Sequence, residues 1–160
     1  MKTFWSTFLN SLQLPKKQAV FALNRIGMDV AVVYMFILLA IASIPGLVDQ
    51  ISSNNAETQL HTFFLLIFFF IFYYLVILII VFSGLSLIAY IGTLIAKLAG
   101  RKLLFGLLWK MTAFATTIPL LAFTVLSFFL PLTTIFLIIA NLFIFFVLIK
   151  IIFIYPKRKL

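Results

Sequence analysis

The stretch FSGLSLIAYIGTLIAKLAGRK, Phe82 to Lys102, is the end of a long apolar run and finishes in a cluster of positive charge. The run begins at Phe63 and carries no charged side chain as far as Ala96. As a helix it would extend about 50 Å, whereas one crossing of a bilayer core needs about 30 Å and two crossings need nearly twice that plus a turn. Length alone therefore leaves one crossing and two crossings open.

The positive charges decide between these alternatives. If the run crosses once, all 12 Lys and Arg residues fall on one side of the membrane. A double crossing that turns at Gly84 would move Lys97, Arg101 and every later basic residue to the outside, against the preference of Lys and Arg for the cytoplasmic side. The sequence therefore predicts one unusually long helix that is tilted, bent near Gly84 or projecting past the bilayer.

The composition is that of an integral membrane protein. Of the 160 residues, 66% are hydrophobic and only 9% are charged, which leaves too little polar surface to cover a soluble globule. The basic residues flank the apolar runs, so we expect them to meet anionic lipid headgroups rather than nucleic acid. The absence of cysteine excludes disulfides and thiolate metal sites, and no cofactor motif is present.

Three further apolar segments accompany the long helix. They run over residues 30–48, 107–129 and 133–154. The predicted fold is all-α, a polytopic membrane protein with four transmembrane helices and both termini in the cytoplasm. We divide the chain into a cytoplasmic segment, residues 1–27, and a transmembrane domain, residues 28–160.

Small side chains mark a predicted contact between the second and third crossings. In the long helix they recur at spacings of three and four, and the third crossing carries a similar series, which would let the two helices approach closely. Small residues are also simply common in membrane helices, which is the alternative. The predicted packing residues are Ser86, Ala89, Thr93, Ala96 and Gly100 in the long helix, and Ala113, Thr117, Thr124 and Ser127 in the third crossing. Pro119 predicts a kink in the third crossing.

The N-terminal stretch KTFWSTFLNSLQLPKK predicts an amphipathic helix that lies in the plane of the cytoplasmic membrane surface. Ser6, Thr7, Asn10, Ser11 and Gln13 form its expected water-facing side. The residues expected to contact the lipid interface are Trp5, Phe8, Leu9, Leu12, Lys16 and Lys17. A docking site for a partner protein would use the same apolar face.

Few residues could carry catalysis or transport. The ionisable candidates are Asp29, Asp49, Glu57 and His61, without nucleotide, nucleophile or metal motifs, so we expect no enzyme activity and no metal. Asp29 is best explained as an acid at the start of a helix. Asn141, near the middle of the fourth crossing, is expected to form a hydrogen bond across helices to Thr116 or Thr117, with contact to a transported substrate as the alternative.

Two stretches, FLNSLQLPKKQAVFALNRIG and LIAKLAGRKLLFGLLWKMTAFATTIPLLAF, resemble the bacterial Yip-one-like membrane proteins, in particular the branch labelled as maltodextrin-utilisation proteins. The resemblance implies a multi-helix protein of the bacterial cytoplasmic membrane that serves transport or membrane organisation. It implies no catalytic residues.

We therefore expect a non-enzymatic membrane protein that acts through lipid or membrane-protein contacts, as an accessory or organising subunit of a complex. The alternative is a small permease component or channel. The expected partners are anionic lipids on the cytoplasmic side, and a membrane-protein complex or further copies of the same chain.

Overall fold

The computed structural model describes residues 2–53, 59–130 and 134–156, and within these ranges it contains helices and no strand. Four helical segments are long and apolar enough to span a membrane. They are Met28–Ser52, Phe63–Leu98, Phe105–Leu126 and Thr134–Ile154. The prediction of an all-α protein with four such helices, one of them unusually long, is confirmed.

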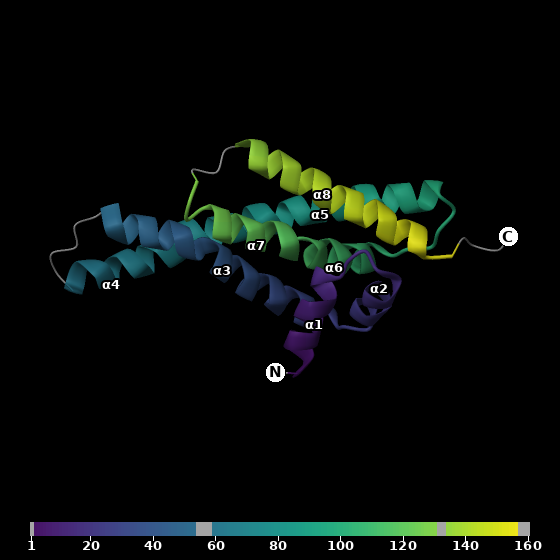
Figure 1. Ribbon diagram of the computed structural model, residues 1–160, viewed down its shortest axis with the longest axis horizontal. Helices are drawn as coiled ribbons and strands as arrows, with labels where there is room; N and C mark the ends of the chain where they lie inside the picture. Colours follow the sequence, from purple (N-terminus) through teal and green to yellow (C-terminus); the bar gives the residue numbers. More distant parts are fainter. Residues whose placement is uncertain (1, 54–58, 131–133, 157–160) are drawn as a thin grey trace.

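The helices form one elongated bundle (Figure 1). In chain order they are α1 (Lys2–Leu12), α2 (Lys17–Asn24), α3 (Met28–Ser53), α4 (Gln59–Phe68), the π-helix η1 (Phe69–Tyr74), α5 (Leu75–Leu98), α6 (Phe105–Ala115), α7 (Thr117–Leu126) and α8 (Thr134–Ile154). The short helices α1 and α2 lie toward the same end of the bundle as the C-terminal turns of α5 and α8, and α4 lies at the opposite end (Figure 1).

The second span is one continuous helical segment made of α4, η1 and α5. It passes through Gly84 without interruption of the helix. The irregularity instead lies at η1, whose last residue, Tyr74, donates a hydrogen bond of 2.8 Å to the backbone oxygen of Phe36 in α3. Aromatic side chains from the widened turn therefore hold the second span against the first.

Gly100 ends the second span. Its φ of 68° lies in the left-handed region, which glycine enters without steric cost. The backbone N–H of Gly100 bonds to the Lys97 oxygen at 3.0 Å, and that of Arg101 bonds to the Ala96 oxygen at 2.8 Å, which is the Schellman arrangement of a helix C-terminus. Nothing lies within 4 Å of a side chain placed at Gly100, so the prediction of Gly100 as a packing residue is wrong.

The third span is divided at Thr116 into α6 and α7. Pro119, three residues later, has no backbone N–H to donate to the preceding turn, so an interruption here agrees with the predicted kink. The two halves differ in burial. Helix α6 supplies the fully buried side chains Leu108, Met111 and Phe114, whereas α7 contains more partly exposed residues.

Helix α6 is at the centre of the fold, and α2, α3, α5 and α8 all pack on it. Val20 and Leu23 of α2 are fully buried in the same hydrophobic core as Leu148 of α8. The N-terminal segment is therefore part of the bundle's core. In contrast, the outer side of α8 carries exposed apolar residues such as Ile135 and Leu142, as expected for a surface that faces lipid.

Candidate functional site

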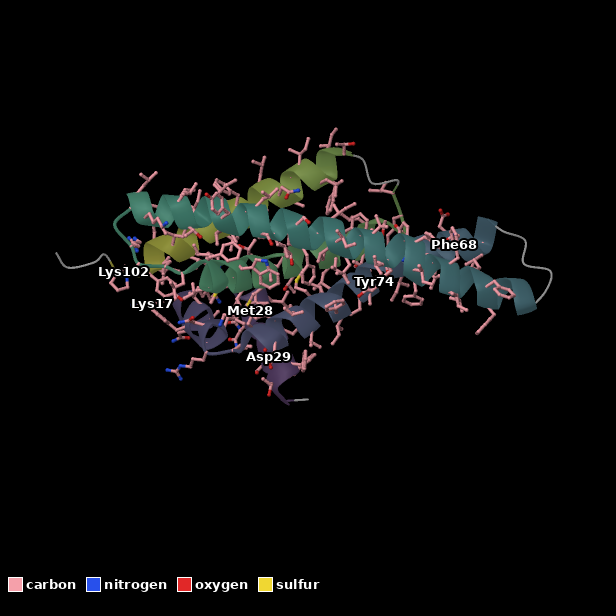
Figure 2. All side chains as sticks on the ribbon, turned by 180° about the vertical axis from the view of Figure 1, so that it is seen from behind. Lys17, Met28, Asp29, Phe68, Tyr74 and Lys102 are labelled. Carbon is pink, nitrogen blue, oxygen red and sulfur yellow. The ribbon has the colours of Figure 1, made fainter. Side chains whose placement is uncertain are left out.

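Positive charge gathers at one end of the bundle, which we call the basic end. It consists of α2, the C-terminal turns of α5 and α8, and the N-terminal half of α6 (Figure 1). Figure 2 shows Lys17 and Lys102 at this end and Phe68 toward the opposite end. The basic residues described there are Lys16, Lys17, Arg25, Lys97, Arg101, Lys102, Lys110 and Lys150. The sequence has no Lys or Arg between residues 26 and 96 or between 111 and 149, so the opposite end carries none from these stretches.

Two of these cations hold parts of the fold together. Arg101 donates a hydrogen bond of 2.8 Å from Nη1 to the backbone oxygen of Ile152, and its guanidinium lies 5.0 Å from the centre of the Phe153 ring. Lys110 donates from Nζ to the backbone oxygen of Asn24 at 2.9 Å and to that of Ile26. In the described part of the chain, neither cation pairs with a carboxylate.

Four other lysines of the basic end point to the surroundings. Lys16, Lys17, Lys97 and Lys102 are all exposed, and no described acidic side chain neutralises them. Their charge is available to anionic groups such as lipid phosphates.

Helix α1 presents its apolar residues outward at this end. Trp5 is 65% exposed and Leu9 is 42% exposed, and Leu12 is exposed as well. Phe8 is only half-buried, and it borders a groove with Tyr34 and Leu38 of α3. The predicted lipid-contacting residues therefore include exposed side chains together with one that also packs on the bundle.

The polar side of α1 differs from the prediction. Thr7 and Ser11 are buried against the bundle, so placing them on the water-facing side was wrong. Their hydroxyls donate to backbone oxygens of their own helix, at 2.7 Å to Thr3 and 2.8 Å to Thr7. A hydroxyl satisfied in this way can enter an apolar contact at little cost, and its small size lets α1 approach the bundle closely.

Helices α5 and α6 pack side by side, as the small residues led us to expect. Ala89 and Ala96 of α5 are fully buried. Ser86 accepts a hydrogen bond of 3.1 Å from Nε1 of Trp109 in α6. Thr93 is half-buried, and its hydroxyl donates to the Ala89 oxygen of its own helix.

The small residues of the third span do not all face the same neighbouring helix. Ala113 is fully buried in α6. Thr117 faces α3, where its Oγ1 lies 2.8 Å from the hydroxyl of Tyr34. Thr124 and Ser127 are half-buried and donate to backbone oxygens of their own segment. The prediction of a single continuous series along the α5 contact is therefore wrong for Thr117, which bonds to α3 instead.

Gly92, which lies where three helices meet, was not among the predicted packing residues. A Cβ atom at Gly92 would be 2.8 Å from Cδ2 of Leu148 in α8 and 3.7 Å from Cδ1 of Leu108 in α6. Its position one helical turn from both Ala89 and Ala96 was the available signal, because it belongs to the same spacing of small residues.

Asn141 does not form the predicted hydrogen bond. It is exposed on α8, and its Nδ2 donates 2.8 Å to the Leu137 oxygen of the same helix. Thr116 donates instead to the oxygen of Ala113 and contacts the sulfur of Met35, and Thr117 is paired with Tyr34. Asn141 and Thr116 nevertheless line one apolar groove of about 320 Å³ between α5, α7 and α8.

We expect the Asn141→Leu variant to be as stable as the parent protein, within about 0.5 kcal/mol, because no bond between helices is lost. The matched comparison is Thr117→Val, which removes the buried contact with Tyr34 and should lower stability by about 1 kcal/mol. Melting temperatures in detergent measure both. A larger loss for Asn141→Leu than for Thr117→Val would contradict the placement of Asn141.

The ionisable candidates do not form a cluster. Asp29 is in the first turn of α3 and Asp49 is close to its C-terminus, so the helix separates them by about 30 Å. His61 belongs to the first turn of α4, and Glu57 lies outside the described residues. Within the described ranges, no group of three or more His, Cys, Asp and Glu residues could hold a metal ion.

Among the comparisons with known proteins, one family model matches the chain. No curated protein matches the chain, and no solved structure matches it. The model of the family described as "Protein of unknown function (DUF1189)" matches residues 49–155, from the end of α3 to the residue after α8. Because the match covers more than half of the chain, this protein belongs to the DUF1189 family.

Proposed function

We propose that this protein is a non-enzymatic component of the bacterial cytoplasmic membrane that acts through contacts with anionic lipid or with other membrane proteins, as an accessory or organising subunit. The observation that supports this role most directly is the outward apolar side of α1 at the basic end. Trp5 and Leu9 are exposed there, and Lys16 and Lys17 follow within one short turn.

This combination has the chemistry of a membrane surface. A helix in the interfacial plane buries its apolar side among the acyl chains near the headgroups, and each neighbouring Lys contributes about 1 kcal/mol when the leaflet is anionic. Helix α1 runs across the long axis of the bundle (Figure 1), as an in-plane helix must when the four spans cross the membrane. The resemblance to Yip-one-like proteins stays a prediction, because the description of the DUF1189 family does not name them.

Trp5 offers a direct test, since the chain has only two tryptophans. In a Trp109→Phe background reconstituted in anionic vesicles, we expect Trp5 fluorescence to be quenched by lipids brominated near the headgroup. Adding Leu9→Glu should reduce the quenching several-fold, because a charge on the apolar side lifts the helix from the interface. Gln13→Glu, an exposed position beyond α1, is the matched control and should leave the quenching unchanged. Quenching unaffected by Leu9→Glu would argue that protein contacts alone hold α1.

We propose further that the basic end and both termini face the cytoplasm, which follows from the preference of Lys and Arg for that side. Single cysteines at Ser52 and Gly100 lie at opposite ends of the bundle. We expect an impermeant thiol reagent, applied to intact cells, to label Ser52→Cys and to leave Gly100→Cys unlabelled. External labelling of Gly100→Cys would show that the basic end faces the outside, opposite to the proposed orientation.

A small permease component is the second candidate, and the groove that contains Asn141 and Thr116 favours it. Polar side chains at membrane depth often mark a substrate pathway. Reconstituted protein that carries solute or ion flux, with the flux lost in Asn141→Leu, would support this candidate. Defined proteins that copurify in mild detergent, without flux from the purified chain, would support the accessory role.

A further inference from the structure

An open cavity of about 610 Å³ lies in the half of the bundle away from the basic end. It is bordered by α3, by η1, and by the C-terminal end of α7 with the residues that follow. Helices α3 and α7 pack against each other, and Figure 1 shows the end of α7 beside α3. The first span ends at Ser52 and the third at Leu126, close to the lining residues Asp49 and Ser127, so we expect the cavity to lie near the boundary between hydrocarbon and headgroups.

Three polar side chains from three different segments line this cavity: Asp49 of α3, Tyr73 of η1 and Ser127 after α7. The carboxylate of Asp49 and the hydroxyls of Tyr73 and Ser127 can all accept hydrogen bonds. The Ser127 hydroxyl already donates to the oxygen of Thr124, which leaves its lone pairs to accept. The aromatic rings of Phe128 and Phe129 complete the wall.

The electrostatics of the cavity favour a cation. In the described part of the chain no Lys or Arg pairs with Asp49, and the nearest basic residues in the sequence are Arg25 and Lys97. Helices α3 and α7 both end here, and the C-terminus of a helix carries partial negative charge. Aromatic rings add attraction for a cation that sits over their faces.

We propose that this cavity binds the primary ammonium group of a lipid headgroup, as in phosphatidylethanolamine. A primary ammonium has three N–H donors, which match the carboxylate of Asp49 and the oxygens of Tyr73 and Ser127. The same cavity is apolar toward the membrane interior, where Ala42 and Phe123 line it, so an acyl chain can lie below the headgroup. A lipid has this order of polar and apolar parts, and a free amine does not.

The π-helix explains how the site is assembled. A π turn rotates the following side chains relative to a regular helix, and such turns are frequent at functional sites. Tyr73 is stacked on Phe69 of the preceding turn, with ring centres 4.7 Å apart, and its hydroxyl lies against Gly46 of α3, where a Cβ would approach it to 2.8 Å. Gly46 therefore provides the space that lets the Tyr73 hydroxyl reach the cavity.

Titration of the full-length protein in detergent, followed by native mass spectrometry, tests this assignment with phosphatidylethanolamine and phosphatidylcholine of identical acyl chains. We expect the ethanolamine lipid to bind more tightly, because methylation removes the N–H donors. Asp49→Asn should weaken its binding about fivefold, the effect of losing one exposed charge interaction. Tyr73→Phe keeps the ring and should weaken binding about twofold.

Asp29→Asn is the matched control, because it neutralises the other acid of α3 at the basic end and should leave binding unchanged. Melting temperatures establish that each variant is folded. Equal binding of the two lipids, unchanged binding in both Asp49→Asn and Tyr73→Phe, or an equal loss in Asp29→Asn would overturn the proposal. Displacement of the bound lipid by an equal concentration of free ethanolamine would overturn the assignment to a lipid and identify a soluble amine instead.

Discussion

The Gly92→Leu variant of the α5 helix should be strongly destabilised. A Cβ at this position already approaches Leu148 to 2.8 Å, and a leucine adds three more carbon atoms in the same direction. Leu148 and Leu108 are both fully buried, so neither can move aside without displacing α8 or α6. Overpacking of this kind costs about 3 kcal/mol, at the upper end of its usual range, because three helices must separate.

Gly84→Leu is the matched control, because it makes the same change two turns earlier in the same helix. Nothing lies within 4 Å of a Cβ at Gly84, which borders the open groove between α5, α7 and α8. We expect its melting temperature in detergent to stay close to that of the parent, while Gly92→Leu melts well below it. Gly92→Ala should lie between them, since one methyl group requires a smaller displacement of α8 than a leucine side chain does. Equal melting temperatures for the two leucine variants would contradict the packing of α8 on α5.

The long second span was predictable because it depends on a global property of the sequence. The hydrophobic length allowed either one crossing or two crossings, and the distribution of Lys and Arg excluded two crossings. The π turn at Phe69–Tyr74 was not predictable in the same way. It lies in a uniformly bulky apolar stretch, and the Tyr74 contact with the Phe36 oxygen that accompanies it joins residues 38 positions apart.

Local hydrogen bonding explains the errors in the polar contacts. Asn141, Thr7 and Ser11 were each assigned a partner or a face from their polarity alone. In the structure each donates to a backbone oxygen four residues earlier in its own helix. A side chain that already forms a hydrogen bond within its own helix does not require a further bond to water or to another helix. Tertiary packing therefore decides where it points.

The contacts of the individual basic residues were also not predictable from the sequence. The sequence identified Lys and Arg as a group that flanks the apolar segments, and this property is enough to predict a lipid-facing charge. It did not distinguish Arg101 and Lys110, which bond to backbone oxygens within the bundle, from the exposed lysines. The distinction depends on which helix ends lie nearby, and only the folded chain brings the end of α2 to α6.

Lys110 is the cation whose removal should change the structure most. It lies in the middle of α6, inside the third span, and its Nζ donates to the backbone oxygens of Asn24 and Ile26. These carbonyl groups lie at and just after the C-terminus of α2, where no further turn of helix supplies N–H donors. A positive charge there also interacts favourably with the helix dipole. Lys110 therefore joins the N-terminal segment to the centre of the bundle.

Lys110→Met replaces the side chain by an unbranched apolar one that is one atom shorter and carries no charge, so we expect the free energy of unfolding to fall by about 2 kcal/mol. Each hydrogen bond from a charged group contributes about 1.5–3 kcal/mol, and relief of the desolvation of the ammonium offsets part of the loss. The change should be local first: backbone hydrogen exchange should accelerate in α1 and α2 before it does in α5 or α8. Lys97→Met removes an exposed lysine at the same end and should alter neither measurement. Protection of α1 and α2 that is unchanged in Lys110→Met would mean that Val20 and Leu23, buried in the core, are sufficient to hold this segment without the lysine.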